Sequence, residues 1–528
     1  MEFLTVILAV SPIIIVVICV LFLRLPADYS GLIGFLTALL VSMLYFHTDA
    51  IVTAKSVLAG IIESLPITLL VAASMLQVFF MEQTGAIKRI AVALKTLGGG
   101  DKIATAIVLN IGVAAILWGV GLNPLSILPL LLISLGFSSY AAVALPAVGS
   151  AALFIYAFLG APLDVFHFYA QGAQTFSQAG GYFPYYILPA TLVTCLGVLY
   201  IAGGWKAVAR GFSSTVIVSA AAYLVSIIAV RFGLVHWTGL ISGISIVALI
   251  LLWRKVRGRS NSEAVTLKDE KVSERNIPLI LALLPLILTA VLFLLTRSLE
   301  PVRYFVVETA SGPVNIVPAH VIRTVPLSQP YLLTLIAVLL AIPFHRSGWK
   351  HFKEAGRKFT RLGLRPVLAA TLFFASAYVM WYSGLEPGIN GFGVMGWIYA
   401  ENGGNMIRVM VLFCEQAFDR LYAIPGTIAG LRMGFISGSE TLPVEMLTRA
   451  NIEAAGIHIR PGGAGLYIAA ASAVAASFMV MFNPARLQNA SAVIGQTGIE
   501  SRVWRTTAVI TVIGVAVTAC IAYLLSTL

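Results

Sequence analysis

The sequence predicts an all-α, polytopic membrane protein with two inverted repeats, re-entrant helical hairpins and discontinuous helices. The first observation is composition: of 528 residues, 59% are hydrophobic and only 11% are charged, whereas soluble proteins carry about 25% charged residues. The second is a pair of short polar interruptions inside apolar sequence, in matching places in the two halves. They read W-G-V-G-L-N-P-L-S at 118–126 and S-G-S-E-T-L-P at 437–443.

Each interruption is followed by a second break in an apolar helix. These breaks are G-A-P at 160–162 and N-P at 483–484. Backbone that leaves a helix inside a membrane is tolerated only where it is buried in protein or lines a wet cavity. Paired breaks in corresponding positions of two halves are the best sequence indication of a transporter's binding site.

The spans follow from the length of the apolar runs, because a crossing helix needs about 20 residues. Two stretches, 103–137 and 405–447, instead hold two apolar arms around a polar tip. The arms of the first have about 15 residues, or roughly 22 Å of helix, which is too short to cross. We therefore expect re-entrant hairpins there, with ordinary span pairs as the alternative. About 12 spans are expected, near 4–25, 30–46, 57–82, 139–163, 183–203, 213–232, 237–253, 277–296, 330–344, 365–384, 461–483 and 504–527.

The chain divides into two repeats and a linking region. Residues 1–205 form the first repeat, residues 206–275 hold two linking spans and a basic loop, and residues 276–528 form the second repeat. Opposite insertion of the two hairpins is what inverted repeats require. In the first repeat, the hairpin is expected at 103–137 and the broken helix at 139–163. In the second repeat, the hairpin is expected at 405–447 and the broken helix at 461–498.

Basic residues predict the orientation in the inner (plasma) membrane. Lys and Arg gather in 254–275 and 345–365, and such loops face the cytoplasm. Counting spans from these anchors places both termini outside. The stretch 348–362 is amphipathic and basic, so we expect it to lie along the cytoplasmic membrane surface. The net charge of +12 is explained by such loops, and no nucleic-acid partner is expected.

The second tip supplies the first candidate site residues. Glu440 lies there between Ser439 and Thr441, and ionisable groups inside a membrane are functional candidates by default. An ionised Glu440 would repel an anion, so we expect it to be protonated during transport or paired with a cation, as the ion-coupling residue. The alternative is a helix cap. Ser437 and Gly438 complete this wall of the site.

The second proline break supplies a cationic candidate. Arg486 follows Asn483-Pro484, and its planar guanidinium matches a carboxylate. The alternative is a structural salt bridge, for instance to Glu440. Gln488 and Asn489 extend the polar patch. The opposing wall of the site is expected from the first tip, and its residues are Gly119, Gly121, Asn123 and Ser126. The alternative is that these residues only kink the helix and bind no ligand.

Other charged residues are weaker candidates. Glu63 lies in an apolar span and is expected to have a structural role. Most charged residues near the second hairpin are expected to have one too, and Arg432 is a weak site candidate among them. Walker A, H-E-x-x-H and Cys-x-x-Cys patterns do not occur, so we expect no enzyme, metal or cofactor. Without a nucleotide site, uphill transport must be coupled to an ion gradient.

Two motifs resemble the bacterial L-lactate/glycolate permease family. F-I-S-G-S-E-T at 435–441 is similar to the family's F-L-T-G-S-D-T. M-F-N-P-A-R-L-Q-N-A-S-A-V-I-G-Q-T-G-I-E-S at 481–501 is similar to its M-I-S-P-Q-S-I-A-I-A-x-A-A-V-G-L-V-G-K-E-S. The resemblance implies a monocarboxylate carrier, usually proton-coupled, in the wider ion-transporter superfamily that includes elevator-type carriers. Carriers of that group are commonly homodimers.

The sequence also departs from that family at two positions. Trp118 stands near the acid of the family's first tip, and Val480 stands where the family has a lysine, while Arg486 supplies a charge six residues later. These departures suit a bulkier or differently charged anion.

Together, these features predict secondary active transport of a small organic anion. We expect a monocarboxylate such as lactate or glycolate, coupled to H+ or Na+, with membrane lipids as the surroundings. The alternatives are a carrier of another organic anion such as a dicarboxylate, a cation/proton exchanger without organic substrate, a passive channel, and a membrane enzyme. The last has only Asp164 and His167 as a candidate catalytic pair.

Overall fold

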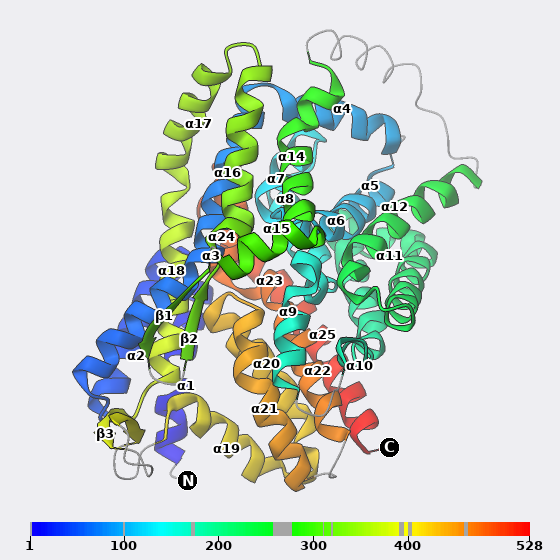
Figure 1. The fold of residues 1–528 in the computed structure, drawn as a ribbon. Coiled ribbons are helices and arrows are strands. Elements are labelled where there is room, and N and C mark those ends of the chain that lie inside the picture. The colour runs from blue at the N-terminus through cyan, green and yellow to red at the C-terminus, as the bar shows by residue number, and fades with distance from the viewer. Residues whose placement is uncertain are drawn as a thin grey trace.

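The computed structural model is a helical protein with many apolar helices (Figure 1). It describes residues 3–98, 101–170, 175–256, 277–309, 311–317, 320–389, 395–399, 404–458 and 463–527. Within these ranges, ten helices are long and apolar enough to cross a membrane, or eleven if the bent pair Ser139–Ala151 and Phe154–Tyr169 is one span. The prediction of an all-α polytopic membrane protein is confirmed.

The count of ten or eleven is below the expected 12 partly because α11 (Pro184–Arg231) is counted once. Gly203 and Gly204 leave helical geometry, and Gly211 packs back against Leu199, so the segments 183–203 and 213–232 are two helical arms joined at this kink. The expected span at 330–344 is the short α16 (Pro330–Ala341), continued by one 3-10 turn. In contrast, the first arm of the first hairpin, Lys102–Gly119, is long enough to cross.

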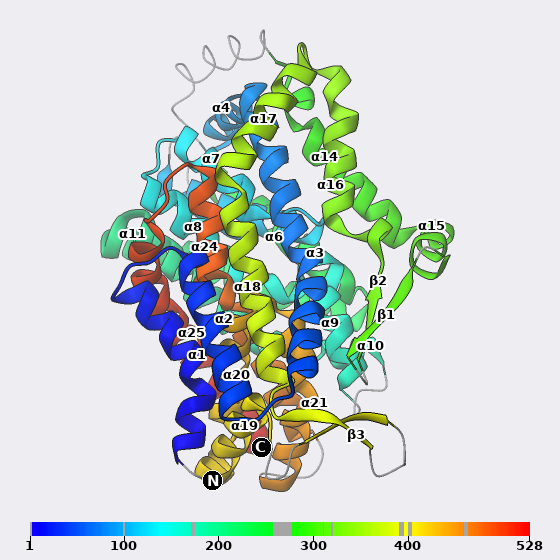
Figure 2. The same ribbon diagram turned by 90° about the vertical axis from the view of Figure 1, so that its left-hand side faces the viewer.

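Two long helical columns stand side by side (Figures 1 and 2). One is α3 (Ala50–Gln83), and the other consists of α17 (Gly348–Leu362) and α18 (Leu364–Trp381). On one side, α1 (Phe3–Leu21) packs on α2 (Ala27–Leu44), which packs on α18. On the other side, α14 (Leu279–Ser298) packs on α16, which packs on α3. The same set of contacts thus occurs twice.

The remaining helices hold the two tips and the two breaks. The first set begins in the upper part of Figure 1 and runs through α5 (Lys102–Ile107), a π-helical turn (Val108–Val113), α6 (Ala114–Gly119), α7 (Pro124–Ser134), α8 (Ser139–Ala151) and α9 (Ala157–Tyr169). The second begins in the lower part and runs through α20 (Ala423–Ser437), α21 (Thr441–His458), α22 (Ala464–Ser477), α23 (Met479–Phe482) and α24 (Pro484–Val493). The other helices are α4 (Ala86–Gly98), α10 (Phe176–Gly180), α12 (Thr238–Val256), α15 (Glu300–Tyr304), α19 (Met406–Phe418) and α25 (Glu500–Thr527).

The second hairpin differs in position from the sequence prediction, and the first broken helix has one bend more than expected. The arms around the second tip are α20 and α21, so this hairpin covers 423–458 and α19 is a separate helix, ended by a turn at Asp419 with φ of +40°. The first broken helix has an additional 70° bend between Ala151 and Phe154, and it leaves helical geometry at 158–160, at the start of the predicted G-A-P. Phe158 and Leu159 then adopt left-handed φ angles of +55° and +54°, which non-glycine residues rarely do.

Four short strands were not expected. β1 (Gly312–Val317) pairs antiparallel with β2 (His320–Thr324), and β3 (Leu385–Ile389) pairs antiparallel with β4 (Met395–Tyr399). Both are isolated two-stranded hairpins that link helices. These strands do not change the helical class.

The amphipathic helix α17 packs along the end of α3 rather than standing alone at the membrane surface. Lys358 donates a 2.5 Å hydrogen bond to Glu82 and lies 4.7 Å from the centre of the Phe79 ring. Figure 1 places α17 at the top of the molecule, whereas the two termini lie at the opposite end.

Close packing of α20 on α22 gives a stability prediction. A Cβ added at Gly430 would overlap the main-chain carbonyl oxygen of Ser472, and small residues at helix contacts let backbones approach in membranes. We expect Gly430→Ala to cost about 1–3 kcal/mol through overpacking and to lower the Tm of the purified protein. Gly356→Ala is the control, because no heavy atom lies within 4 Å of its added Cβ. An unchanged Tm for Gly430→Ala would show that α20 and α22 are further apart.

Candidate functional site

The second tip is a sharp turn between α20 and α21. Gly438 ends α20 in the left-handed region with φ of +62°, which glycine adopts without steric cost. The Ser437 hydroxyl accepts a hydrogen bond from the Ser439 N–H at 3.2 Å, and the hydroxyls of Ser439 and Thr441 are 2.9 Å apart. Glycine and short hydroxyl side chains therefore turn the chain and leave polar groups at its apex.

The break before α24 is produced by Asn483 and Pro484. Asn483 is extended and its Oδ1 accepts from the Arg486 N–H at 3.1 Å, while Pro484 occupies the first turn. Asparagine is a preferred N-cap and proline suits the first helical position. The other side-chain atom of Asn483, Nδ2, donates to the Phe435 carbonyl at 2.7 Å. One residue thus starts α24 and ties it to the second tip.

Arg486 is buried where the two tips meet, with a side chain that is 7% exposed. Its Nε and Nη2 donate to the Gly438 carbonyl at 3.1 and 2.8 Å. Its guanidinium carbon lies 5.8 Å from the centre of the Trp118 ring and 5.4 Å from that of Phe154. The second tip fixes the cation, and aromatic faces of the first repeat cover it.

Glu440 is buried beside the same turn. Its Oε1 accepts a hydrogen bond from the Ser477 hydroxyl, whereas its Oε2 is buried without a hydrogen-bond partner among the described residues. The alternative prediction was a salt bridge between Glu440 and Arg486. The hydrogen bonds instead join the Arg486 guanidinium to the Gly438 carbonyl. Glu440 therefore retains one oxygen for a further partner.

The first tip uses the same helix-starting pair as α24. Asn123 caps α7, with its Oδ1 accepting from the Leu125 N–H at 3.1 Å, and Pro124 follows it. The preceding Gly121 has φ of +80°, and an added Cβ there would lie 2.8 Å from the Phe293 ring. Ser126 reaches the other half of the chain, with its hydroxyl 3.2 Å from Asn489 Nδ2.

A cavity of about 200 Å³ lies between these elements. Five predicted site residues line it, namely Asn123, Ser439, Glu440, Thr441 and Arg486. The other predicted residues are buried but do not line the cavity. They end or cap helices or contact neighbouring helices, and they are Gly119, Gly121, Ser126, Ser437, Gly438, Asn483, Gln488 and Asn489. The remaining lining is mostly apolar, from Ile67, Leu70, Val71, Phe154 and Phe158, with Pro66, Ala161, Pro162, Arg297, Gln329 and Pro330 completing it.

Two charged residues near the site were missed from the sequence. Arg297, in the last turn of α14, lines the cavity; an arginine that ends an apolar run usually indicates only a membrane boundary. Asp28 is buried on α2, where its Oδ1 accepts from Gln488 Nε2 at 2.9 Å and its Oδ2 lies 3.8 Å from Arg365 Nε. Asp28 could have been noticed in the sequence, because a carboxylate at the start of an apolar span is a candidate functional group.

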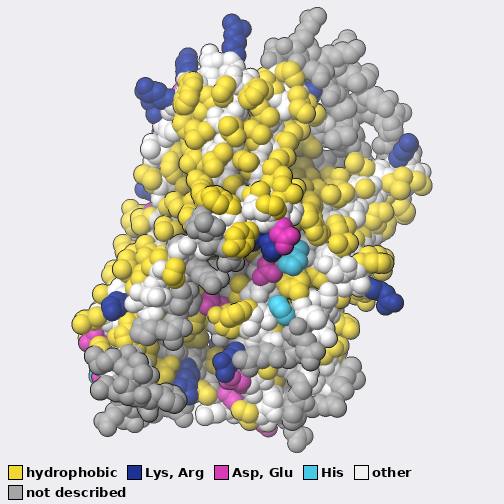
Figure 3. All heavy atoms as spheres, viewed as in Figure 1, with side chains coloured by type: hydrophobic (Ala, Val, Ile, Leu, Met, Phe, Trp, Pro, Cys, Tyr) yellow, Lys and Arg dark blue, Asp and Glu magenta, His cyan; other side chains and the backbone are white. Residues whose placement is uncertain are grey.

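Polar groups also gather near the middle of the face in Figure 3, where acidic, basic and histidine side chains lie together within an apolar surface. Asp164, on α9, is 3.1 Å from His236, so the candidate pair Asp164 and His167 is not the pair that forms. Among the described residues, no group of three potential metal ligands occurs.

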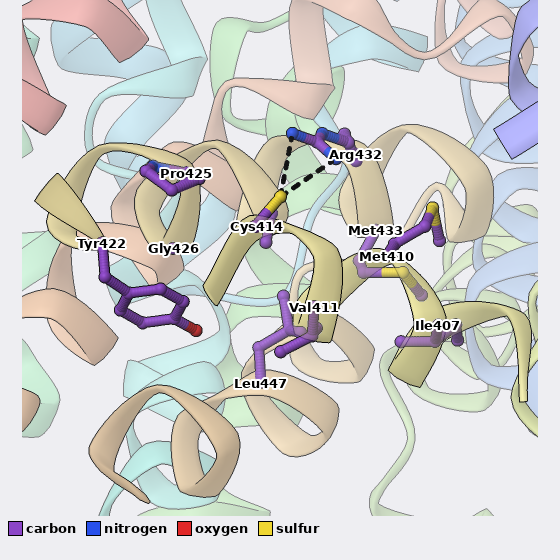
Figure 4. A pocket seen from close by; sticks show the side chains of 11 residues that line it. Ile407, Met410, Val411, Cys414, Tyr422, Pro425, Gly426, Arg432, Met433 and Leu447 are labelled. Atoms are coloured by element: carbon purple, nitrogen blue, oxygen red, sulfur yellow. Dashed lines mark hydrogen bonds between the residues drawn. The ribbon is translucent and has the colours of Figure 1, made fainter. Parts of the chain in front are cut away.

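Arg432 belongs to a different pocket (Figure 4). It faces Cys414, with Nη2 3.9 Å from the sulfur, across a small apolar pocket of about 20 Å³ between α19, α20 and α21. Arg432 does not line the main cavity, and neither does Glu63 on α3. These two weaker candidates are therefore separate from the site.

The fold and site define a polytopic membrane protein with a mostly apolar cavity that a few polar and charged side chains from helix ends line. The family model for L-lactate permease matches residues 5–528. The chain therefore belongs to the L-lactate permease family, which is a family of transporters and not of enzymes. No curated protein matches the chain.

Proposed function

We propose that this protein is a secondary active transporter of a monocarboxylate such as lactate or glycolate, coupled to H+ or Na+. The observation that carries the proposal is the buried Arg486 on the wall of a mostly apolar cavity. The Gly438 carbonyl accepts from Nε and Nη2, and the rest of the guanidinium is proposed to receive the substrate carboxylate. A charge-assisted hydrogen bond of this kind is among the strong ones.

The hydroxyl side chains suit the rest of such a substrate. Ser439, Thr441 and the Asn123 amide line the same cavity, so a hydroxyl beside the carboxylate would find partners there. The apolar wall, with Ile67 and Leu70, would contact the hydrocarbon part. A small number of polar groups in an apolar cavity is the usual composition of a small-molecule site.

Glu440 is the proposed coupling residue. Its carboxyl lines the cavity with Oε2 unpartnered, so it can bind a proton on the same side as the substrate anion. When Glu440 is protonated, the carboxyl no longer repels the carboxylate and can donate a hydrogen bond. Proton and anion then enter together, and release of one favours release of the other because the binding free energies are coupled.

The repeated helix contacts support two inverted repeats, 1–205 and 276–528. The packing of α1 on α2 and α2 on α18 has its counterpart in α14 on α16 and α16 on α3. Similarly, α21 contacts α9 and α7 contacts α24. We propose that the tips and broken helices move as one body against the columns α3 and α17–α18, as in elevator-type carriers. Asp28 and Gln488 would then form a contact that this motion breaks.

The orientation follows from the same arrangement. The basic helix α17 and the two termini lie at opposite ends (Figure 1). Basic segments favour the cytoplasmic side, so we propose that both termini face outward from the plasma membrane.

Transport assays on proteoliposomes test the function. Purified protein is reconstituted into vesicles, labelled L-lactate is added outside, and a pH gradient is imposed that is acid outside. We expect lactate to accumulate inside the vesicles above its external concentration. A sodium gradient without a pH gradient tests the other ion. Equilibration without accumulation under either gradient would indicate a passive channel, and ion exchange without any lactate uptake would indicate a cation/proton exchanger.

A further inference from the structure

Arg297 is a second cationic group in the cavity, and it reaches the cavity from a different helix than Arg486. It lies in the last turn of α14, whereas Arg486 lies in the first turn of α24. Both side chains line the same 200 Å³ space. The site therefore contains two guanidinium groups and the single carboxyl of Glu440.

The Nε of Arg297 is a buried donor without an acceptor. No described residue accepts a hydrogen bond from it, and its guanidinium carbon lies 5.7 Å from the centre of the Phe293 ring. The nearby acid Asp164 has its described contact with His236, at 3.1 Å. Because buried donors are almost always hydrogen-bonded, an orphaned one beside a cavity indicates a missing acceptor.

We propose that Arg297 is a second anion-binding residue, and that the cavity also accepts small dicarboxylates. One carboxylate binds Arg486, the other binds Arg297, and the chain between them lies on the apolar wall. This inference rests on the proposed function, since it uses the same cavity. With Glu440 protonated, the two arginines match the two negative charges of a dianion, whereas a monocarboxylate on Arg486 leaves the buried Nε of Arg297 without an acceptor.

The cavity volume limits the length of the dianion. A water molecule occupies about 30 Å³ in the liquid, so 200 Å³ is the volume of about seven waters. A dicarboxylate of about four carbons fits such a space. The rings of Phe154 and Phe158 line it and would contact the hydrocarbon part of the dianion.

Competition assays test the assignment. Labelled lactate uptake into proteoliposomes is measured with unlabelled succinate or butyrate, for the wild type and for Arg297→Gln. We expect succinate to inhibit the wild type more strongly than butyrate. In Arg297→Gln, we expect at least a tenfold weaker inhibition by succinate, with the KM for lactate changed less than threefold. Arg297→Lys should restore part of the succinate inhibition.

Arg303→Gln is the matched control, since this exposed arginine on the neighbouring α15 does not line the cavity. Lactate accumulation without succinate inhibition in the wild type would overturn the dicarboxylate inference alone. Equal losses for lactate and succinate in Arg297→Gln would also overturn it, because a general structural defect affects both. Absence of lactate uptake by the wild type would overturn the proposed function as well.

Discussion

Arg486→Ala is expected to abolish anion uptake while the protein remains folded. Leaving one partner of a buried charge pair without the other costs about 3–5 kcal/mol. This cost corresponds to a loss of affinity of about 10²- to 4 × 10³-fold, at about 1.4 kcal/mol per tenfold change. Arg486 also donates to the Gly438 carbonyl, so the variant loses a contact that holds the second tip. Uptake of labelled lactate and the Tm in detergent are therefore measured together.

Two further variants separate charge from geometry at this position. Arg486→Lys keeps the charge but loses the planar fork, so we expect uptake between those of the wild type and Arg486→Ala. Arg432→Ala removes an arginine in a separate pocket and should leave uptake nearly unchanged. A folded Arg486→Ala protein with wild-type uptake would remove Arg486 from the substrate site.

Glu440→Gln is expected to separate substrate movement from the ion gradient. Glutamine has nearly the same shape and can still accept the Ser477 hydrogen bond, but it cannot bind and release a proton. We expect lactate exchange across the membrane to continue, while accumulation under an imposed pH gradient falls to the equilibrium level. Counterflow of labelled lactate and accumulation are the two measurements.

Glu445→Gln serves as the control for this second prediction. Glu445 lies on the same helix, α21, where it accepts a 2.9 Å hydrogen bond from the Tyr169 hydroxyl, and it does not line the cavity. Its accumulation ratio should stay at the wild-type value. Unaltered pH and sodium dependence of Glu440→Gln would reduce Glu440 to a group that caps or supports the tip.

The parts of the site that depend on local chemistry could be predicted from the sequence. The Asn-Pro pairs at 123–124 and 483–484 each start a helix in the structure, because capping and the fixed φ of proline act over a few residues. Gly438 turns the second tip for a similarly local reason. Arg486 and Glu440 stood out because ionisable groups are rare inside apolar segments.

Other parts depend on packing between distant segments and were missed. Arg297 lines the cavity only because α14 lies beside it, and Asp28 meets Gln488 across 460 residues of sequence. The first broken helix also has a 70° bend between Ala151 and Phe154, in addition to the break beside its glycine and proline. Phe158 and Leu159 hold left-handed backbone there, and such a conformation persists only when the surrounding structure imposes it.

The site's location can be tested by protection of an engineered thiol. In a variant without the four native cysteines, Thr441→Cys places a thiol on the cavity wall, and Thr360→Cys places one on the exposed surface of α17. We expect saturating L-lactate to slow maleimide labelling at position 441 and not at position 360. If lactate raises the Tm of the Thr441→Cys protein but leaves both labelling rates unchanged, the anion binds elsewhere and the account is contradicted.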